Sequence, residues 1–349
     1  MSGEVTLPGT GRLLLDVRGL TVRFPTPDGV VQAVSDLSFQ LHRGETLGIV
    51  GESGSGKSVS NLAIMGLLNR DKAQISGEVL FEGVDLLALA PNELRKLRGN
   101  RIAMVFQDPF ACLHPMYRVG DQIAEAVRAH ADVSKHAALT RAVELLDAVG
   151  LPNARARSRD YPHQFSGGMR QRAMIAMALV NDPDVLIADE PTTALDVTVQ
   201  AQILALIDTV KRDFDIGVIL VTHDLGVIAE TADTVMVMYA GRTMELGPAR
   251  ELFRAAQHPY TWGLLDSMPT IQRRLAQLTP IEGSPPSLIT PPPGCPFHPR
   301  CTFRFDRCDQ ELPRAVADGL PHLDACLLPQ QRKLEQQALR AAARQGTTP

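Results

Sequence analysis

A glycine-rich string near the N-terminus leaves few folds open to this chain. It reads Gly51-Glu52-Ser53-Gly54-Ser55-Gly56-Lys57-Ser58 and continues into Val59. An apolar run, 46–50, precedes it, and a helical-looking segment, 59–68, follows it. Glycines let successive backbone N–H groups turn toward a phosphate, and the positive end of the following helix points at the same anion. The order of strand, loop and helix therefore predicts a phosphate-binding P-loop.

Two side chains of the string add chemistry to this backbone. Lys57 places a full charge against the β- and γ-phosphates of a nucleotide, and the Ser58 hydroxyl can ligate Mg²⁺. The alternative is a surface turn without function. The complete G-x4-G-K-S pattern behind an apolar strand argues against that alternative.

Composition excludes several classes of protein. The 349 residues are 44% hydrophobic and 21% charged, as in an ordinary globular protein, and the net charge is −4, which offers no basic field for nucleic acid. The apolar run 173–180 is far shorter than a bilayer span. The start of the chain lacks a signal-peptide pattern, so we expect a cytosolic protein whose five cysteines are not paired as disulfides.

Three further apolar runs end in polar side chains that suit phosphate chemistry. Gln107 follows the run 101–106, Asp189 and Glu190 follow the run 184–188, and His223 follows the run 217–222. The carboxyl ends of parallel strands form the ligand-binding edge of an open α/β sheet. We expect Asp189 to hold Mg²⁺ and Glu190 to polarise the attacking water. A lone histidine is often structural, but the position of His223 at this edge favours a role in the site.

A second anion site is predicted far along the chain from the first. The segment Ser166-Gly167-Gly168-Met169 opens a helix that runs through Leu179, with Ser166 as its N-cap and two glycines that expose backbone N–H groups. A plain capped helix is the alternative interpretation. The chain has one P-loop, so two copies facing each other would satisfy both anion sites at once.

In the order given, these motifs resemble the nucleotide-binding subunit of an ATP-binding cassette (ABC) transporter over residues 13–262. The resemblance implies an α/β P-loop cassette, with a mainly parallel core sheet, an N-terminal antiparallel β subdomain and an inserted helical subdomain. We expect the cassette to span 12–257, with the helical insertion at about 108–180.

The ABC resemblance also implies ligands and roles for particular residues. It implies a head-to-tail pair of cassettes with ATP between residues 51–59 of one and 166–169 of the other, next to the turn that ends at Asp196. Mg²⁺ would be held by Ser58, Gln107 and Asp189, and His223 would contact the γ-phosphate. Phe24 would stack on adenine, although its position in an apolar run also fits a half-buried strand residue. Met169 departs from the glutamine of many relatives.

The composition changes beyond residue 257, where a proline-rich, irregular segment follows. Cys295, Cys301, Cys308 and Cys326 form a C-x5-C-x6-C-x17-C set within it. The set is typical of a metal site, and its wide spacing suits an iron–sulfur cluster better than zinc; unligated thiols are the third possibility. Cys112 is expected to be an ordinary thiol. We expect this extension to span 258–330, followed by a solvated, frayed helical tail at 331–349.

The extension resembles that of dipeptide and oligopeptide importer ATPases, through His258-Pro259-Tyr260-Thr261, Gly283-Ser284-Pro285-Pro286 and the cysteines. That resemblance implies a [4Fe-4S] cluster, a second homologous ATPase, two membrane permeases and an extracytoplasmic peptide-binding protein. It places the chain on the cytoplasmic face of the inner membrane. Relatives of this type also move nickel or glutathione, so the cargo stays open.

A soluble cassette ATPase acting on nucleic acid is the alternative from another class. Such a factor would usually fuse two cassettes in one chain and carry a basic tail. This chain has one P-loop and is mildly acidic, so we expect a transporter motor and no nucleic-acid partner.

Overall fold

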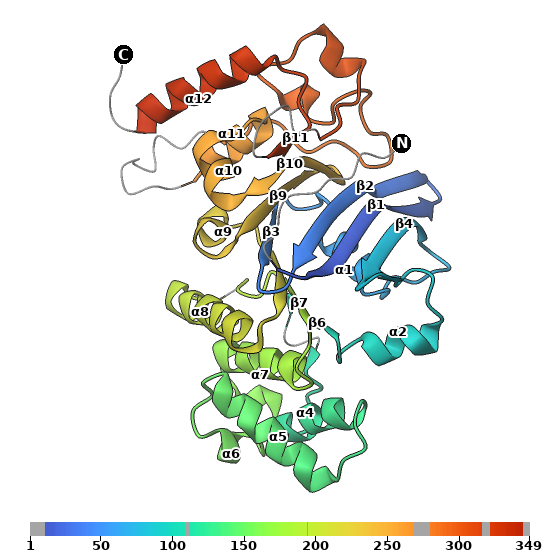
Figure 1. The fold of residues 1–349 in the computed structure, drawn as a ribbon, viewed down its shortest axis with the longest axis vertical. Coiled ribbons are helices and arrows are strands. Elements are labelled where there is room, and N and C mark those ends of the chain that lie inside the picture. Colours follow the sequence, from blue (N-terminus) through green and yellow to red (C-terminus); the bar gives the residue numbers. More distant parts are fainter. Residues whose placement is uncertain (1–10, 109–111, 194, 269–279, 316–321, 345–349) are drawn as a thin grey trace.

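The computed structural model describes residues 11–108, 112–193, 195–268, 280–315 and 322–344. Two sheets occupy its middle, a helical segment extends from one end, and the C-terminal extension covers the other (Figure 1). Within these ranges no helix combines the length and the apolar character needed to span a bilayer.

The N-terminal sheet is antiparallel and has the order β2-β1-β4-β5. Its long strands are β1 (Leu13–Thr26) and β2 (Gly29–His42), and β4 (Gln74–Phe81) and β5 (Val84–Asp85) complete it. The alternation of buried and exposed residues along β2 explains why its sequence could be assigned to a strand. The expected antiparallel subdomain is present.

The core sheet has seven strands in the order β11-β10-β9-β3-β8-β7-β6. Its strands are β3 (Thr46–Val50), β6 (Ile102–Val105), β7 (Val185–Asp189), β8 (Gly217–Val221), β9 (Thr234–Tyr239), β10 (Arg242–Pro248) and β11 (Leu323–Asp324). The pairs β9-β3, β3-β8, β8-β7 and β7-β6 are parallel, and β10 runs antiparallel to both of its neighbours. The expected mainly parallel sheet is therefore confirmed.

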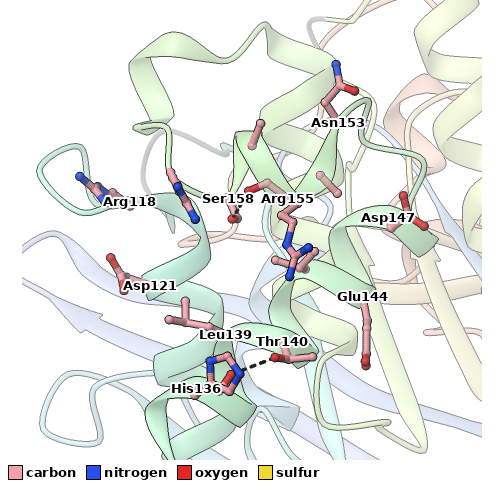
Figure 2. A pocket seen from close by; sticks show the side chains of 14 residues that line it. Arg118, Asp121, His136, Leu139, Thr140, Glu144, Asp147, Asn153, Arg155 and Ser158 are labelled. Atoms are coloured by element: carbon pink, nitrogen blue, oxygen red, sulfur yellow. Dashed lines mark hydrogen bonds between the residues drawn. The ribbon is translucent and has the colours of Figure 1, made fainter.

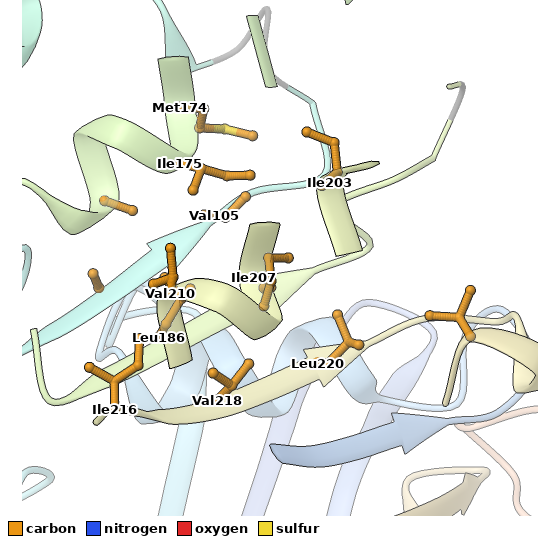
Figure 3. Packing of buried hydrophobic residues seen from close by; sticks show 14 of the residues in the cluster. Val105, Met174, Ile175, Leu186, Ile203, Ile207, Val210, Ile216, Val218 and Leu220 are labelled. Atoms are coloured by element: carbon orange, nitrogen blue, oxygen red, sulfur yellow. The ribbon is translucent and has the colours of Figure 1, made fainter. Parts of the chain in front are cut away.

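Helices cover both faces of this sheet, which is why its central strands are continuously apolar. Leu186, Val218 and Leu220 pack against Ile203 and Ile207 of α8 (Val197–Phe214), and α7 (Gly167–Leu179) adds its own apolar face (Figure 3). Alternate residues of the same strands face the other cluster, beside α1 (Lys57–Ile64) and the N-terminal sheet. Burial on both faces holds the strand ends in fixed positions.

The remaining helices lie at the periphery of the two sheets. They are α2 (Pro91–Leu97), α4 (Val119–Arg128), α5 (Lys135–Ala148), α6 (Ala154–Arg157), α9 (Leu225–Thr231), α10 (Ala249–Ala255), α11 (Pro259–Asp266) and α12 (Gln330–Arg344). Short 3₁₀ turns form at η1 (Pro162–Gln164), η3 (His298–Arg300) and η4 (Asp306–Asp309). Helices α4 to α7 make up the helical segment (Figure 1).

The C-terminal extension is joined to the core sheet. The expectation of a solvated tail at 331–349 is wrong for the first part of that tail. Strand β11 pairs with β10, and the Lys333 ammonium in α12 lies 2.7 Å from a carboxylate oxygen of Asp324. Arg340 forms an ion pair with Asp266 and places its guanidinium 5.1 Å from the centre of the Trp262 ring. Helix α12 is therefore packed against the extension.

Candidate functional site: a nucleotide-binding edge of the core sheet

The loop after β3 is shaped by glycines that no other residue could replace without strain. Gly51 and Gly56 have φ angles of 154° and 100°. A Cβ atom on Gly51 would lie 2.1 Å from the Met238 carbonyl oxygen, and one on Gly56 would lie 2.4 Å from that of Ala33. The tight approach of β9 and β2 therefore requires glycine at both positions.

Lys57 begins α1 and turns its side chain back over the loop. Its ammonium donates to the carbonyl oxygens of Gly51 at 2.8 Å and Glu52 at 3.0 Å. The side chain is buried, and this burial lowers the pKa of Lys57, while the nearby Glu190 and Asp189 carboxylates oppose the shift. A phosphate in the loop would give this ammonium a stronger acceptor than the two carbonyls.

The next residue of α1 faces the end of β7. The Ser58 hydroxyl donates to Asp189 at 3.1 Å. Burial raises the pKa of Asp189, and the Ser58 hydrogen bond partly opposes that rise. A hydroxyl and a carboxylate this close provide two oxygen ligands of the kind that Mg²⁺ prefers.

Glu190 is the centre of a second set of contacts at the same edge. One of its carboxylate oxygens accepts from the Gln107 amide at 2.8 Å and from the Thr193 hydroxyl at 2.9 Å, and it lies 3.6 Å from Nδ1 of His223. Glu190 has a left-handed φ of 48°, and its backbone N–H donates to Val221 at 2.9 Å. Three polar residues that follow three different strands are thus brought together, as the parallel sheet predicts.

The segment 166–169 begins α7 and remains open to solvent. The Ser166 hydroxyl caps the helix by accepting from the Met169 N–H at 3.3 Å, and Ser166 and Gly167 are exposed. Gly168 fits tightly, because an added Cβ would lie 2.7 Å from the Val199 side chain on α8. Asp196 caps α8 in turn, by accepting from the Val199 N–H at 2.9 Å. The exposed helix start is therefore fixed in place by its neighbour.

Comparison with family models and with known proteins shows which proteins this chain is similar to. A model described as ABC transporter matches residues 34–193, and one described as the C-terminal region of oligopeptide/dipeptide transporters matches 244–308. The chain is 52% identical to the dipeptide transport ATP-binding protein DppD of Bacillus subtilis, over 91% of this chain and 96% of that relative. It is 51% identical to the oligopeptide transport ATP-binding protein OppD of Haemophilus influenzae, over 90% and 97%.

The chain belongs to the ATP-binding subunits of dipeptide and oligopeptide ABC transporters. The resemblance predicted from the motifs is therefore confirmed. Among solved structures, the dimeric ABC transporter cassette MJ0796 is similar, with a TM-score of 0.61 and 28% identity over 68% of this chain and 99% of that one. A second structure of MJ0796, described as a post-hydrolysis state bound to ADP and Pi, aligns equally well.

A groove in this ABC subunit opens beside the nucleotide edge. It has a volume of about 690 Å³ and lies between the core sheet and the helical segment. Polar residues of the nucleotide edge line one side, namely Ser58, Gln107, Asp108 and Asp189, and apolar residues such as Met174 and Met177 of α7 line the other. The groove therefore connects the expected Mg²⁺ ligands with the helical segment.

Another hollow lies away from this chemistry. It has a volume of about 1,000 Å³, and Arg118, Asp121, His136, Glu144 and Arg155 are among its lining residues (Figure 2). All of its lining residues lie between 118 and 159, and none of the predicted site residues is among them. Its side chains carry both signs of charge, so it offers no net attraction for a phosphate.

Phe24 lies in β1 and is partly buried against the cluster under the N-terminal sheet. Its observed burial fits a half-buried strand residue, and its stacking on adenine stays a prediction.

The four cysteines of the extension line one small cavity of about 20 Å³. Burial raises the pKa of Cys301 to about 11 and that of Cys326 to about 12, and it also raises the pKa of Cys295. Within the described ranges, no group of three or more His, Cys, Asp or Glu side chains is arranged to hold a metal ion. The C-terminal extension is present, but the metal site expected in it is not supported, since the thiols share a cavity without converging on one point. Cys112, by contrast, is a half-buried thiol as expected.

Two contacts to the P-loop were not predicted from the sequence. Arg300 pairs with the Glu52 carboxylate at 2.8 Å, and the Tyr260 hydroxyl accepts from the Glu52 N–H at 2.9 Å. Both partners lie more than 200 residues from Glu52, and Arg300 is part of no motif recognised in the sequence. Tyr260 stands in the noted segment 258–261, which was its only signal.

Proposed function

We propose that this chain is the ATP-hydrolysing motor of an importer for dipeptides or oligopeptides. The observation that carries the proposal is the meeting of the P-loop with Gln107, Asp189, Glu190 and His223 at one sheet edge, in a chain about half identical to peptide-transport ATP-binding proteins. Binding and hydrolysis of ATP would drive cargo movement by the membrane subunits.

The proposed roles follow from the side chains and their positions. Residues 51–59 would bind the phosphates through backbone N–H groups and the Lys57 ammonium. Ser58, Asp189 and Gln107 would hold Mg²⁺, which supplies charge neutralisation when bound. Glu190 would polarise the attacking water, and His223 would contact the γ-phosphate. Gln107 and Thr193 already fix the Glu190 carboxylate that this role requires.

A complete site requires a second cassette. Ser166, Gly167, Gly168 and Met169 form a capped, solvent-exposed helix start suited to a phosphate, and Asp196 fixes the neighbouring helix. We infer a head-to-tail pair in which this segment covers ATP bound to the partner's P-loop, with Phe24 against adenine. Because ATP would join the two cassettes, it would favour the closed state, and hydrolysis would remove that preference. The partner is proposed to be a second homologous ATPase.

The groove beside Gln107 is the proposed docking site for the permeases. It is lined by apolar methionines and by the residue that would bind Mg²⁺, so an inserted permease helix would sense the nucleotide state. Two permeases and an extracytoplasmic peptide-binding protein would complete the importer. The chain would then lie on the cytoplasmic face of the inner membrane.

A [4Fe-4S] cluster is proposed for the cysteine cavity. Four thiols of a reduced set line it, with His258, Phe297 and Phe303 around them. The thiolates of such a cluster bind four different irons, so they need not converge on one point as zinc ligands must. The donor set fits a cluster by this criterion. The test is anaerobic purification: a brown, iron-containing protein is expected, and a colourless protein with stoichiometric zinc would exclude the cluster.

Transport by the reconstituted complex tests the function itself. The chain would be co-expressed with its permeases and partner ATPase, and uptake of dipeptides, longer peptides, nickel and glutathione would be compared. ATP-dependent peptide uptake is expected. Uptake of nickel or glutathione without uptake of peptides would contradict the proposed peptide cargo but would leave the proposed role as transport ATPase unchanged. A chain that stays wholly soluble beside its permeases would favour a non-transport ATPase.

A further inference from the structure

Glu52, the second residue of the P-loop, has all of its polar groups held by other parts of the chain. Its carboxylate accepts from Nη1 of Arg300 at 2.8 and 3.1 Å. Its backbone N–H donates to the Tyr260 hydroxyl at 2.9 Å, and its carbonyl accepts from Lys57 at 3.0 Å. Two of these partners, Arg300 and Tyr260, come from beyond residue 257, outside the expected cassette.

Arg300 is itself fixed by its surroundings. Its side chain is 7% exposed. Nε donates to the Glu282 carbonyl at 2.9 Å, Nη2 donates to that of Ile281 at 3.2 Å, and Nη1 also donates to the Tyr239 hydroxyl at 3.2 Å. The guanidinium carbon lies 5.7 Å from the centre of the Tyr239 ring. A side chain bound on so many sides has little freedom left to lose when it pairs with Glu52.

Tyr260 is equally constrained. The residue is fully buried, and its ring packs against Tyr239 and Phe297, with centroids 4.7 and 5.2 Å away. Phe297 stands in the irregular segment of the extension and also contacts Tyr239, at 5.4 Å. The three rings form one packed unit between the end of β9, helix α11 and the extension, so the hydroxyl that Glu52 contacts has a fixed position.

The negative charge on Glu52 is the reason why these contacts matter for phosphate binding. A carboxylate in a loop that binds phosphates repels them, and the repulsion is strong where water is scarce. Arg300 neutralises this carboxylate, while Tyr260 fixes the backbone at the first turn of the loop. Without the guanidinium, an unpaired negative charge would remain beside the triphosphate site.

We propose that Arg300 is a positioning residue for the nucleotide site: it acts through Glu52, so that the C-terminal extension completes the P-loop. Tyr260 supports the same residue from its backbone side. The inference rests on the proposed binding of ATP. It predicts that the extension contributes to nucleotide affinity without contacting the nucleotide.

The test measures binding of a fluorescent ATP analogue with Mg²⁺ to the full-length chain, together with the KM and kcat of ATP hydrolysis. Arg300→Gln is expected to weaken binding about 10- to 100-fold, the range for loss of a hydrogen-bonded charge partner. The increase should appear in Kd and KM rather than in kcat. Arg300→Lys, which keeps the charge, should recover part of the affinity. Arg307→Gln is the matched control, because Arg307 is exposed in the same extension and, among the described residues, its side chain pairs with Glu311 four positions away.

The decisive comparison repeats Arg300→Gln in a Glu52→Gln background. If Arg300 acts through Glu52, its substitution there should weaken binding no more than about twofold, since the carboxylate is already gone. An equal loss in both backgrounds would overturn the proposal, as would Arg300→Gln binding like the Arg307→Gln control. Failure of the unmodified chain to bind ATP would instead refute the proposed function.

A further variant covers the case in which Arg300→Gln does not fold. Tyr260→Phe keeps the ring packing and removes only the hydroxyl that accepts from Glu52. It should weaken nucleotide binding about 3- to 10-fold, the range for one neutral hydrogen bond. Unchanged affinity in this folded variant would overturn the role of the extension.

Discussion

The buried ion pair between α12 and β11 allows a quantitative test of how firmly the C-terminal helix is attached. The Lys333 ammonium lies 2.7 Å from the Asp324 carboxylate and donates to the Cys326 carbonyl at 3.2 Å, and both charged side chains are 2% exposed. Lys333→Met keeps the length of the side chain but leaves a buried, unpaired carboxylate. Breaking one partner of such a pair costs about 3–5 kcal/mol.

The destabilisation caused by Lys333→Met should depend on pH. Burial raises the pKa of Asp324, and the Lys333 charge opposes that rise. Without Lys333, the carboxyl group would take up a proton to avoid burying a charge, and the unfolded chain would not. The destabilisation by Lys333→Met should therefore be smaller at pH 5 than at pH 8.

Amide hydrogen exchange measured by mass spectrometry reports this attachment locally. At about 1.4 kcal/mol per tenfold change, peptides from α12 and β11 should exchange roughly 150- to 4,000-fold faster in Lys333→Met. Arg332→Met is the control, because Arg332 is the exposed neighbour on the same helix. Adding Asp324→Leu to Lys333→Met should restore much of the protection. Equal exchange in Lys333→Met and Arg332→Met would refute the reasoning.

Three further predictions concern individual side chains. Glu190→Gln should slow phosphate release about 10²- to 10⁴-fold while ATP stays bound, and normal turnover would exclude Glu190 as the group that polarises water. Lys57→Ala should weaken ATP binding about 10- to 100-fold in a fluorescence titration, and unchanged affinity would contradict the P-loop assignment. Burial, helped by the Lys333 charge, lowers the pKa of His258 to about 3, so stability present above pH 6.5 should be lost as pH falls toward 3. His258→Asn keeps an acceptor for the Tyr260 N–H, so the free energy of unfolding, measured by urea titration, should decrease less between pH 7 and pH 4.5 than in the unmodified chain. An equal decrease in both proteins would show that other groups cause the loss.

The nucleotide edge could be predicted because its physics is local. An apolar strand followed by a polar residue at its carboxyl end is visible in the sequence, and a parallel sheet places all such residues on one edge. That rule was enough to anticipate that Gln107, Glu190 and His223 lie together. The hydrogen bond from Thr193 to Glu190 was not anticipated, because a threonine in a turn has many possible partners.

The extension was harder to predict for equally physical reasons. Strand β11 has only two residues, too few to show a period. Lys333 stands in a polar helix whose sequence suggests solvent on every side, and its burial depends on Asp324. The pairing of Arg300 with Glu52 joins residues 248 positions apart, and nothing in either local sequence indicates the other.

The position of β11 bears on how fragments of this protein would behave. It covers the outer side of β10, where Glu245 and Leu246 pair with Asp324 and Leu323. A shortened cassette that stops after α10 would leave the backbone donors and acceptors of β10 bare, and an open strand of this kind recruits other chains. Such a fragment is expected to self-associate. Its solubility and stoichiometry would then reflect the exposed edge of β10 and not the properties of the native subunit.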